Sequence, residues 1–183
     1  KLNRDADVAG PDVDGNGVIT TDDRIIYSQR PDVTFGFNNT FNYKGFDLSV
    51  FLYARLGQWI AYDYNTTYRI NALENGGNVD YWTPENPTNA FPRPNKSKSY
   101  TQVTYYSTLK YEDGSFFKIR DITLGYTFKP ELLKHLNLSR LRVYATAKNF
   151  FTFSKIDNYD PEQGGSISFP MTKQLVFGLN VEF

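Results

Sequence analysis

Oxygen-bearing side chains alternate along a short polar segment near the start of the sequence. Over twelve residues from Asp12, acids or an amide occupy positions 1, 3 and 5, glycine occupies position 6, and an acid occupies position 12. This is the spacing of an EF-hand loop, in which alternate residues direct oxygens at Ca²⁺, with Asp in place of the usual Glu at position 12. The expected ligands are Asp12, Asp14, Asn16, the backbone carbonyl of Val18, and Asp23. A solvated loop of Asx turns has a similar composition, so both interpretations stay open.

Other chemistry has little support in the residue pattern. The single histidine, His135, has no recognisable carboxylate or nucleophile partner, and no hydrolase, P-loop or Rossmann motif is present. We therefore expect no enzymatic activity. The two tryptophans, Trp59 and Trp82, lie in a long segment rich in Tyr and Asn, so they are the candidates for ligand contact. Packing of this segment against itself is the alternative.

The composition excludes several classes of protein. The formal net charge is zero, which gives no indication of nucleic acid binding. The absence of cysteine removes disulfides and thiolate chemistry. Phe and Tyr together make up 29 of the 183 residues, and aromatic residues favour strands and membrane interfaces. No stretch is apolar for about 18 residues, so no transmembrane helix is expected, although half-apolar membrane strands remain compatible.

Period-two alternation predicts an all-β fold with five long antiparallel strands. Residues 33–56 form a hairpin around the two-residue turn Lys44-Gly45. Residues 116–183 supply the last three strands, with a bulge expected near Arg120-Asp121 and a short helical turn beginning at Pro130. The two strands of the hairpin have about eleven residues each, roughly twice the usual length in soluble proteins.

Short turns alternate with longer loops between these strands, and a further polar segment precedes the first strand. Residues 1–32 carry the calcium-like motif, residues 57–115 form a long irregular loop with short helices expected around 58–75, and residues 154–171 form a third loop. Short turns alternating with long loops are typical of outer-membrane barrels. Five strands cannot close a barrel, so the membrane interpretation makes the chain a piece of a larger one. A secreted calcium-stabilised β-sandwich that binds carbohydrate is the alternative.

Spaced motifs along nearly the whole chain carry a family resemblance. The segments that carry it are Asp12–Asp23 with Arg24, Pro31-Asp32, residues 37–41, 43–50, 112–116, 122–126, 141–144 with Asn149, the sequence Tyr159-Asp160-Pro161-Glu162, and residues 177–183. In these segments the chain resembles the C-terminal part of a SusC/RagA-like (starch-utilisation-type) TonB-dependent outer-membrane transporter.

This resemblance implies more than composition does. It implies the C-terminal five antiparallel strands of a 22-stranded transmembrane β-barrel with long extracellular loops, surrounded by outer-membrane lipid and joined to the remainder of the barrel. It also implies import of glycans or oligopeptides, powered by the inner-membrane TonB complex through a missing N-terminal part. A SusD-like surface lipoprotein is the implied partner, and Phe183 matches the aromatic residue read as an assembly signal. The implied location is the Gram-negative outer membrane.

Overall fold

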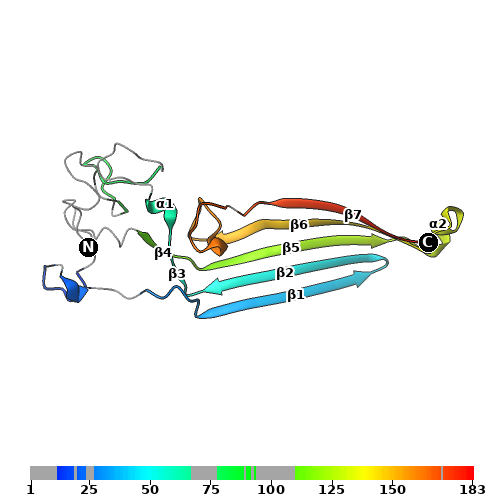
Figure 1. Ribbon diagram of the computed structural model, residues 1–183, viewed down its shortest axis with the longest axis horizontal. Coiled ribbons are helices and arrows are strands. Elements are labelled where there is room, and N and C mark those ends of the chain that lie inside the picture. The colour runs from blue at the N-terminus through cyan, green and yellow to red at the C-terminus, as the bar shows by residue number, and fades with distance from the viewer. Residues whose placement is uncertain are drawn as a thin grey trace.

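One antiparallel sheet dominates the structure. The computed structural model describes residues 12–18, 20–23, 27–66, 78–88, 90, 91, 93, 110–169 and 171–183. Five strands lie side by side in the order β1-β2-β5-β6-β7, so each long strand pairs with the next one along the chain (Figure 1). Their bounds are β1 Val33–Tyr43, β2 Phe46–Leu56, β5 Phe116–Thr127, β6 Arg140–Ser154 and β7 Gln174–Glu182. The expected five long antiparallel strands are confirmed.

The β1–β2 hairpin forms around the expected turn. Lys44 and Gly45 both have positive φ, 48° and 89°, as a type I′ turn requires. This turn matches the right-handed twist of the strands, and it sets the register in which Tyr43 lies opposite Phe46. The pairing then continues without interruption to Val33 opposite Leu56.

A bulge interrupts the sheet where the phase of the sequence changes. Arg120 has no partner in either neighbouring strand, because Ile119 and Asp121 carry the pairing on each side of it. Opposite it on β6 the pairing passes from Lys148 to Phe151, and Asn149 adopts a positive φ of 59°. The expected bulge near Arg120-Asp121 is therefore confirmed. By absorbing the extra residue, it keeps apolar side chains on one face along the whole of β5.

The register places most of the apolar residues of the five strands on one face, with exceptions such as Phe51 and Val176. One row across the sheet runs Phe41, Leu48, Leu124, Ala145 and Phe177. Much of this face is exposed, with Phe41 60%, Leu124 50% and Phe177 76% accessible. An apolar surface this large is typical of a face that meets a partner or a membrane. We call it the apolar face, and we call the opposite face of the sheet the polar face.

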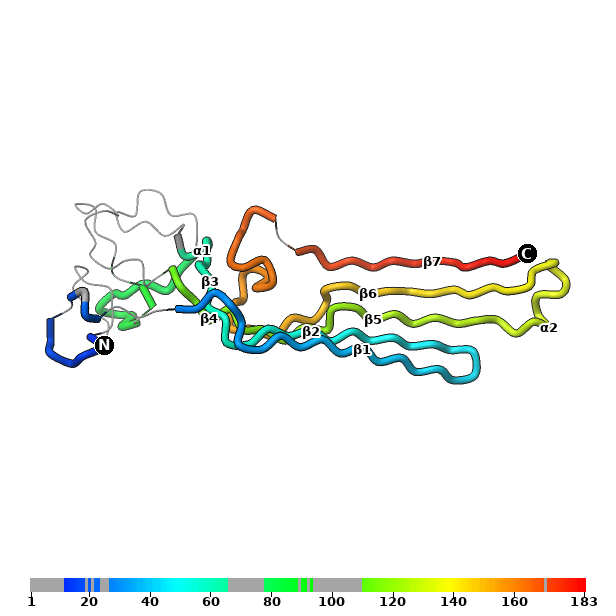
Figure 2. Tube along the Cα trace, turned by 60° about the horizontal axis from the view of Figure 1, so that its bottom comes forward, coloured from blue at the N-terminus to red at the C-terminus, as the bar shows by residue number. Residues whose placement is uncertain are grey.

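The two ends of the sheet differ. The short turns, helix α2 (Pro130–Leu133) and the following 3₁₀ turn Lys134–Leu136 lie at one end, and the described parts of the longer connections lie at the other (Figures 1 and 2). The short helical turn at Pro130 was expected, and His135 is exposed there. We call these the short-turn end and the long-loop end. Among the described residues, no helix is long and apolar enough to cross a membrane.

The long-loop end contains structure that the sequence pattern did not predict. Strand β3 (Trp59–Ala61) pairs antiparallel with β4 (Tyr111–Asp113), and helix α1 covers only Asp63–Thr66. Short helices were expected around 58–75, so the part at 59–61 was wrong, while residues 67–75 lie outside the described residues. A small core of Ile60, Tyr62 and Ile156 joins this region to the connection after β6.

Close packing on the polar face depends on a glycine. Gly178 on β7 lies opposite Tyr144 on β6, and a Cβ added at Gly178 would run into the Tyr144 ring. The absence of a side chain therefore lets the aromatic ring lie flat over the neighbouring strand. By contrast, a Cβ added at Gly36 would meet the Phe51 ring at an ordinary 3.7 Å.

Gly178→Ala should destabilise the folded protein, because the new methyl group must displace the Tyr144 ring. Overpacking of this kind costs about 1–3 kcal/mol. Chemical unfolding of the full-length protein measures the loss, and Gly36→Ala, placed on the same face of β1, is the matched control. Adding Tyr144→Ala should recover part of the loss as a coupling of about 0.5–3 kcal/mol. Strictly additive effects would show that the ring and the glycine do not depend on each other.

Candidate functional site

The acidic segment folds into a tight loop held by its own side chains. The two carboxylate oxygens of Asp12 accept hydrogen bonds from the backbone N–H groups of Gly15 (2.7 Å) and Gly17 (2.9 Å). Both glycines have positive φ, 76° and 82°, a conformation that costs other residues more. The sequence Asp-x-x-Gly-x-Gly therefore folds locally around Asp12.

The next two oxygen-bearing residues continue this pattern. Asp14 accepts from the backbone N–H of Asn16 at 3.0 Å, and the Asn16 side chain donates to the other oxygen of Asp14 at 2.7 Å. The amide oxygen of Asn16 accepts from the backbone N–H of Val18 at 2.7 Å. Each oxygen keeps a second lone pair, so these bonds orient the side chains without using all of their acceptor capacity.

Asp23 closes the loop from the other end. Its carboxylate accepts from the backbone N–H groups of Val13 (2.8 Å), Asp14 (3.4 Å) and Thr20 (2.7 Å), and the residue is only 6% exposed. The bond from Thr20 is the largest cause that lowers the pKa of Asp23, with smaller contributions from Val13 and Asp14, while burial opposes them. Asp23 is therefore ionised at neutral pH.

The loop brings three of the expected ligands together. Carboxylate oxygens of Asp12, Asp14 and Asp23 all lie within 4.8 Å of one another. Within the described part of the chain, no lysine or arginine forms an ion pair with them. Clustered carboxylates repel each other, and a hard cation with oxygen ligands is the usual compensation. The donor set therefore fits Ca²⁺, and the role of Asn16 and of the Val18 carbonyl stays a prediction.

Trp59 belongs to an aromatic stack at the long-loop end. Its ring lies 4.3 Å from that of Tyr27, which lies 5.6 Å from that of Tyr111 on β4. The Trp59 backbone N–H donates to the carbonyl of Ser28 at 2.8 Å, and this bond joins the start of β3 to the segment that precedes β1. All three aromatic residues are half-buried. The stack therefore offers partly accessible ring surface, and sequence reasoning found only its tryptophan.

Trp82 occupies a separate small turn. Its backbone N–H donates to the carbonyl of Phe91 at 3.0 Å, and Asn86 bonds both the Asp80 carboxylate and the Tyr81 carbonyl. The Trp82 indole N–H is buried without a partner among the described residues. No described contact joins Trp82 to Trp59, so the structure does not bring the two candidates into one site.

A buried ion-pair cluster on the polar face was missed by sequence reasoning. Lys118 on β5 is fully buried, and its Nζ lies 2.6 Å from the Asp160 carboxylate and 2.9 Å from that of Glu162. Arg120 also binds Glu162, at 3.1 Å. Both acids lie in the connection after β6, around the 3₁₀ turn Pro161–Gln163, so this latch holds that connection against the sheet.

A second ion pair lies further along the polar face. The guanidinium of Arg142 on β6 binds the carboxylate of Asp47 on β2 through two nitrogens, one of them at 2.9 Å. It reaches across Gly125 of the intervening strand, where an added Cβ would collide with it. The Thr123 and Thr146 hydroxyls also bond at 2.8 Å. Charges on this face are therefore mostly paired across strands.

Phe183 follows β7 at the short-turn end and is 94% exposed. Among the described residues, no aromatic contact is found for the Phe183 ring. Its role as an assembly signal stays a prediction.

Lys118→Ala should release the connection after β6. Removing one partner from a buried ion pair costs about 3–5 kcal/mol, because the remaining charges lose their compensation. We expect residues 155–169 to become sensitive to protease added on the long-loop side, while the strands stay protected. Lys148→Ala is the matched control, because Lys148 is 47% exposed and lies 3.8 Å from Asp121. Equal protease resistance of both variants would show that the cluster does not hold the connection.

Comparisons with known proteins agree with the fold. The chain is 31% identical over 208 residues to a protein named TonB-dependent receptor P3 of Formosa agariphila, covering 100% of this chain and 20% of the relative. It is also 31% identical to TonB-dependent receptor SusC of Bacteroides thetaiotaomicron, over 94% of this chain and 17% of that protein. The chain thus spans about a fifth of the length of the curated relatives it matches. No family model matches it.

Solved structures point the same way. The RagAB peptide importer in its closed-closed state superposes with a TM-score of 0.71 at 27% identity, covering 94% of this chain and 20% of that one. A second RagAB peptide transporter structure gives 0.70 at 26% identity. These relatives are named receptors and importers rather than enzymes. Because the superposed structures are transporter barrels, the fold of this chain is part of a barrel and not the alternative β-sandwich. The chain therefore belongs to the SusC/RagA-like TonB-dependent outer-membrane transporters and forms part of their β-barrel.

Proposed function

We propose that the chain forms a section of wall and outer mouth in an importer of glycans or oligopeptides. The observation that carries the proposal is the two-sided sheet, which has a continuous exposed apolar face and a polar face with paired charges. Such a sheet suits a barrel wall between lipid and a water-filled interior. Uptake would use energy from the inner-membrane TonB complex, which we assign to the remainder of a longer polypeptide.

The proposed orientation follows from the two ends of the sheet. Short turns face the periplasm in bacterial outer-membrane barrels, and longer loops face outward. The long-loop end would then carry the calcium-like loop, the aromatic stack and the latched connection on the cell surface. A SusD-like surface lipoprotein is the proposed partner at this end. SusC and RagAB, the proteins that the chain resembles, motivate this assignment.

The aromatic stack is the proposed ligand-contacting feature. Trp59 and its two tyrosine neighbours present half-buried rings, and flat ring surface suits the apolar faces of sugars and the side chains of peptides. Trp82 is a second proposed contact, in a turn that its own hydrogen bonds keep rigid. Rigid aromatic groups bind with little loss of conformational entropy.

Trp59→Ala should weaken ligand binding to the assembled transporter and its lipoprotein by roughly tenfold, which corresponds to about 1.4 kcal/mol. Binding of a panel of oligosaccharides and oligopeptides, measured by calorimetry, tests this and also identifies the substrate class. Trp59→Phe is the matched control, since it keeps an aromatic surface and should retain most of the affinity. Unchanged affinity in the alanine variant would remove the stack from the binding site, and absence of any bound sugar or peptide would contradict the proposed function.

We also propose that the Asp12–Asp23 loop binds Ca²⁺ and thereby stiffens the outer end. The three gathered carboxylates and the glycine-shaped turn support this role. Asp14 and Asn16 point their oxygens into the same loop, and the carbonyl of Val18 would add a backbone ligand.

Ca²⁺ should raise the thermal stability of the outer end, and a chelator should reverse the effect. A ligand at a hundred times its Kd stabilises the site by about 2.7 kcal/mol. Asp12→Asn with Asp14→Asn should abolish the response, whereas Asp22→Asn, an exposed neighbour outside the cluster, should not. A Ca²⁺ response that survives the double substitution would place the ion elsewhere.

The lowered pKa of Asp23 also gives the stability of the loop a pH dependence. The ionised Asp23 carboxylate stabilises the folded loop fully at pH values above the ordinary pKa of 3.8. This stabilisation is lost as the pH falls through the lowered pKa of the folded state.

A further inference from the structure

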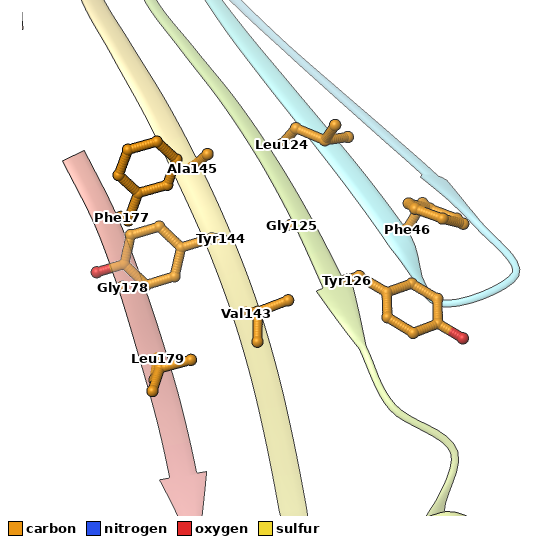
Figure 3. Close-up of a pocket in the computed structure, with 10 residues that line it drawn as sticks. All are labelled: Phe46, Leu124, Gly125, Tyr126, Val143, Tyr144, Ala145, Phe177, Gly178 and Leu179. Carbon is orange, nitrogen blue, oxygen red and sulfur yellow. The ribbon is translucent and has the colours of Figure 1, made fainter. Parts of the chain in front are cut away.

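A hollow indents the apolar face near the short-turn end. Its side-chain walls come from four strands, with Val143 and Ala145 of β6 between larger neighbours (Figure 3). The lining apolar side chains are Phe46, Leu124, Tyr126, Val143, Ala145, Phe177 and Leu179. Tyr144, Gly125 and Gly178 also border it, although the register places these residues on the opposite phase.

The hollow is a consequence of side-chain size and register. On β6 three successive residues of the apolar face, Val143, Ala145 and Ala147, have small side chains, between Leu141 on one side and Phe151 on the other. The residues opposite Ala145 are Leu124 on β5 and Phe177 on β7, both much longer. Small side chains on one strand between longer ones on both neighbours leave a furrow along the middle strand.

The dimensions of this furrow suit a hydrocarbon chain. Its walls stand on strands that are two inter-strand spacings apart, about 9–10 Å between backbones. The run of small side chains from Val143 to Ala147 extends roughly 13 Å along β6, and the hollow itself is lined by Val143 and Ala145 of this run. One leaflet of a hydrocarbon core about 30 Å thick is close to that length. The furrow is therefore narrow enough for one chain and no longer than one leaflet.

Positive charge collects at the short-turn end, beyond Leu141 of β6 and next to the hollow. Four exposed basic residues lie in the turns or at the strand ends there, with two exposed acids, Glu131 and Glu182. The basic residues are Lys44, Lys129, Lys134 and Arg140. Glu182 pairs with Arg140 at 3.2 Å, which leaves a lysine excess. Lys44 lies 5.0 Å above the Tyr43 ring, beside the aromatic group of Phe46 and Tyr126, whose rings are 4.6 Å apart.

We propose that the furrow holds one acyl chain of an anionic phospholipid, with its phosphate among the lysines of the short-turn end. The apolar walls bind the chain by dispersion and exclusion of water, and the lysines select the negative headgroup. Aromatic rings at this level suit the interface between hydrocarbon and headgroup. The leaflet assignment rests on the orientation given under the proposed function, so the ligand would be a periplasmic-leaflet lipid.

The test is photolabelling of the full-length transporter in vesicles. Phosphatidylglycerol with a diazirine in its acyl chain is the probe, phosphatidylcholine with the same chain is the neutral comparison, and mass spectrometry locates the label. We expect label to concentrate at Val143, Ala145 and Leu179, with a higher yield from the anionic probe. Ala145→Phe should fill the furrow and lose most of this label, whereas Leu56→Phe, at the far end of the apolar face, should not. Lys129→Gln with Lys134→Gln should abolish the preference for the anionic probe.

Each contrary result has a distinct meaning. Label spread evenly over the apolar residues of all five strands would overturn the proposal, because lipid would then be only a general solvent for the barrel. Equal yields from the two probes would also overturn it. Protection of the furrow by a cross-linked second copy would assign the surface to an oligomer instead. Complete absence of label from the apolar face would contradict the membrane orientation itself, and binding of sugars or peptides is measured independently of all these results.

Discussion

Backbone hydrogen bonding in hydrocarbon is the constraint on which this structure depends. Water is absent there, so each unpaired N–H or C=O group costs several kcal/mol and spanning strands must be paired on both sides. Strands β2, β5 and β6 meet this requirement within the chain, while β1 and β7 each leave one edge unpaired in the five-stranded sheet. Neighbouring strands of a closed barrel supply the missing partners in proteins of this family. The long strands and the continuous register follow from the same requirement.

Register determines which residues meet lipid, because a slip of one residue would move every side chain to the other face. The Lys44-Gly45 turn sets the register at one edge, and the bulge at Arg120 restores it in the middle of the sheet. Both devices could be predicted from the sequence, because each is a local signal: a glycine turn between alternating runs, and a change of phase within one run. Strand positions were therefore predictable to within about a residue or two, which is the usual limit for element boundaries.

Contacts between distant segments could not be predicted in the same way. Lys118 and its two acidic partners are separated by 42 and 44 residues, and β3 finds β4 across a connection of about fifty. Neither pairing produces a periodic pattern in the sequence. A single lysine in a strand, for example, cannot be distinguished from any other polar residue of the alternation. The acidic loop is the opposite case: its hydrogen bonds join residues at most ten positions apart, so the gathering of Asp12, Asp14 and Asp23 followed from spacing alone.

Under the proposed function, the ion pairs on the polar face also affect what this section of wall would offer a passing ligand. Asp160, Glu162, Asp47 and their basic partners neutralise each other on the polar face, so little net charge remains on this section of wall. Hydroxyl and amide groups such as Thr40, Asn38 and Ser49 lie on the same face, together with aromatic rings such as Tyr53 and Tyr144. A wall of neutral donors and acceptors favours ligands rich in hydroxyl or peptide groups over strongly charged ones, because it can satisfy their hydrogen bonds without leaving a buried charge unpaired. Glycans and oligopeptides share this property, so the wall would be compatible with either proposed ligand class, and the proposal assigns discrimination between them to the outer loops.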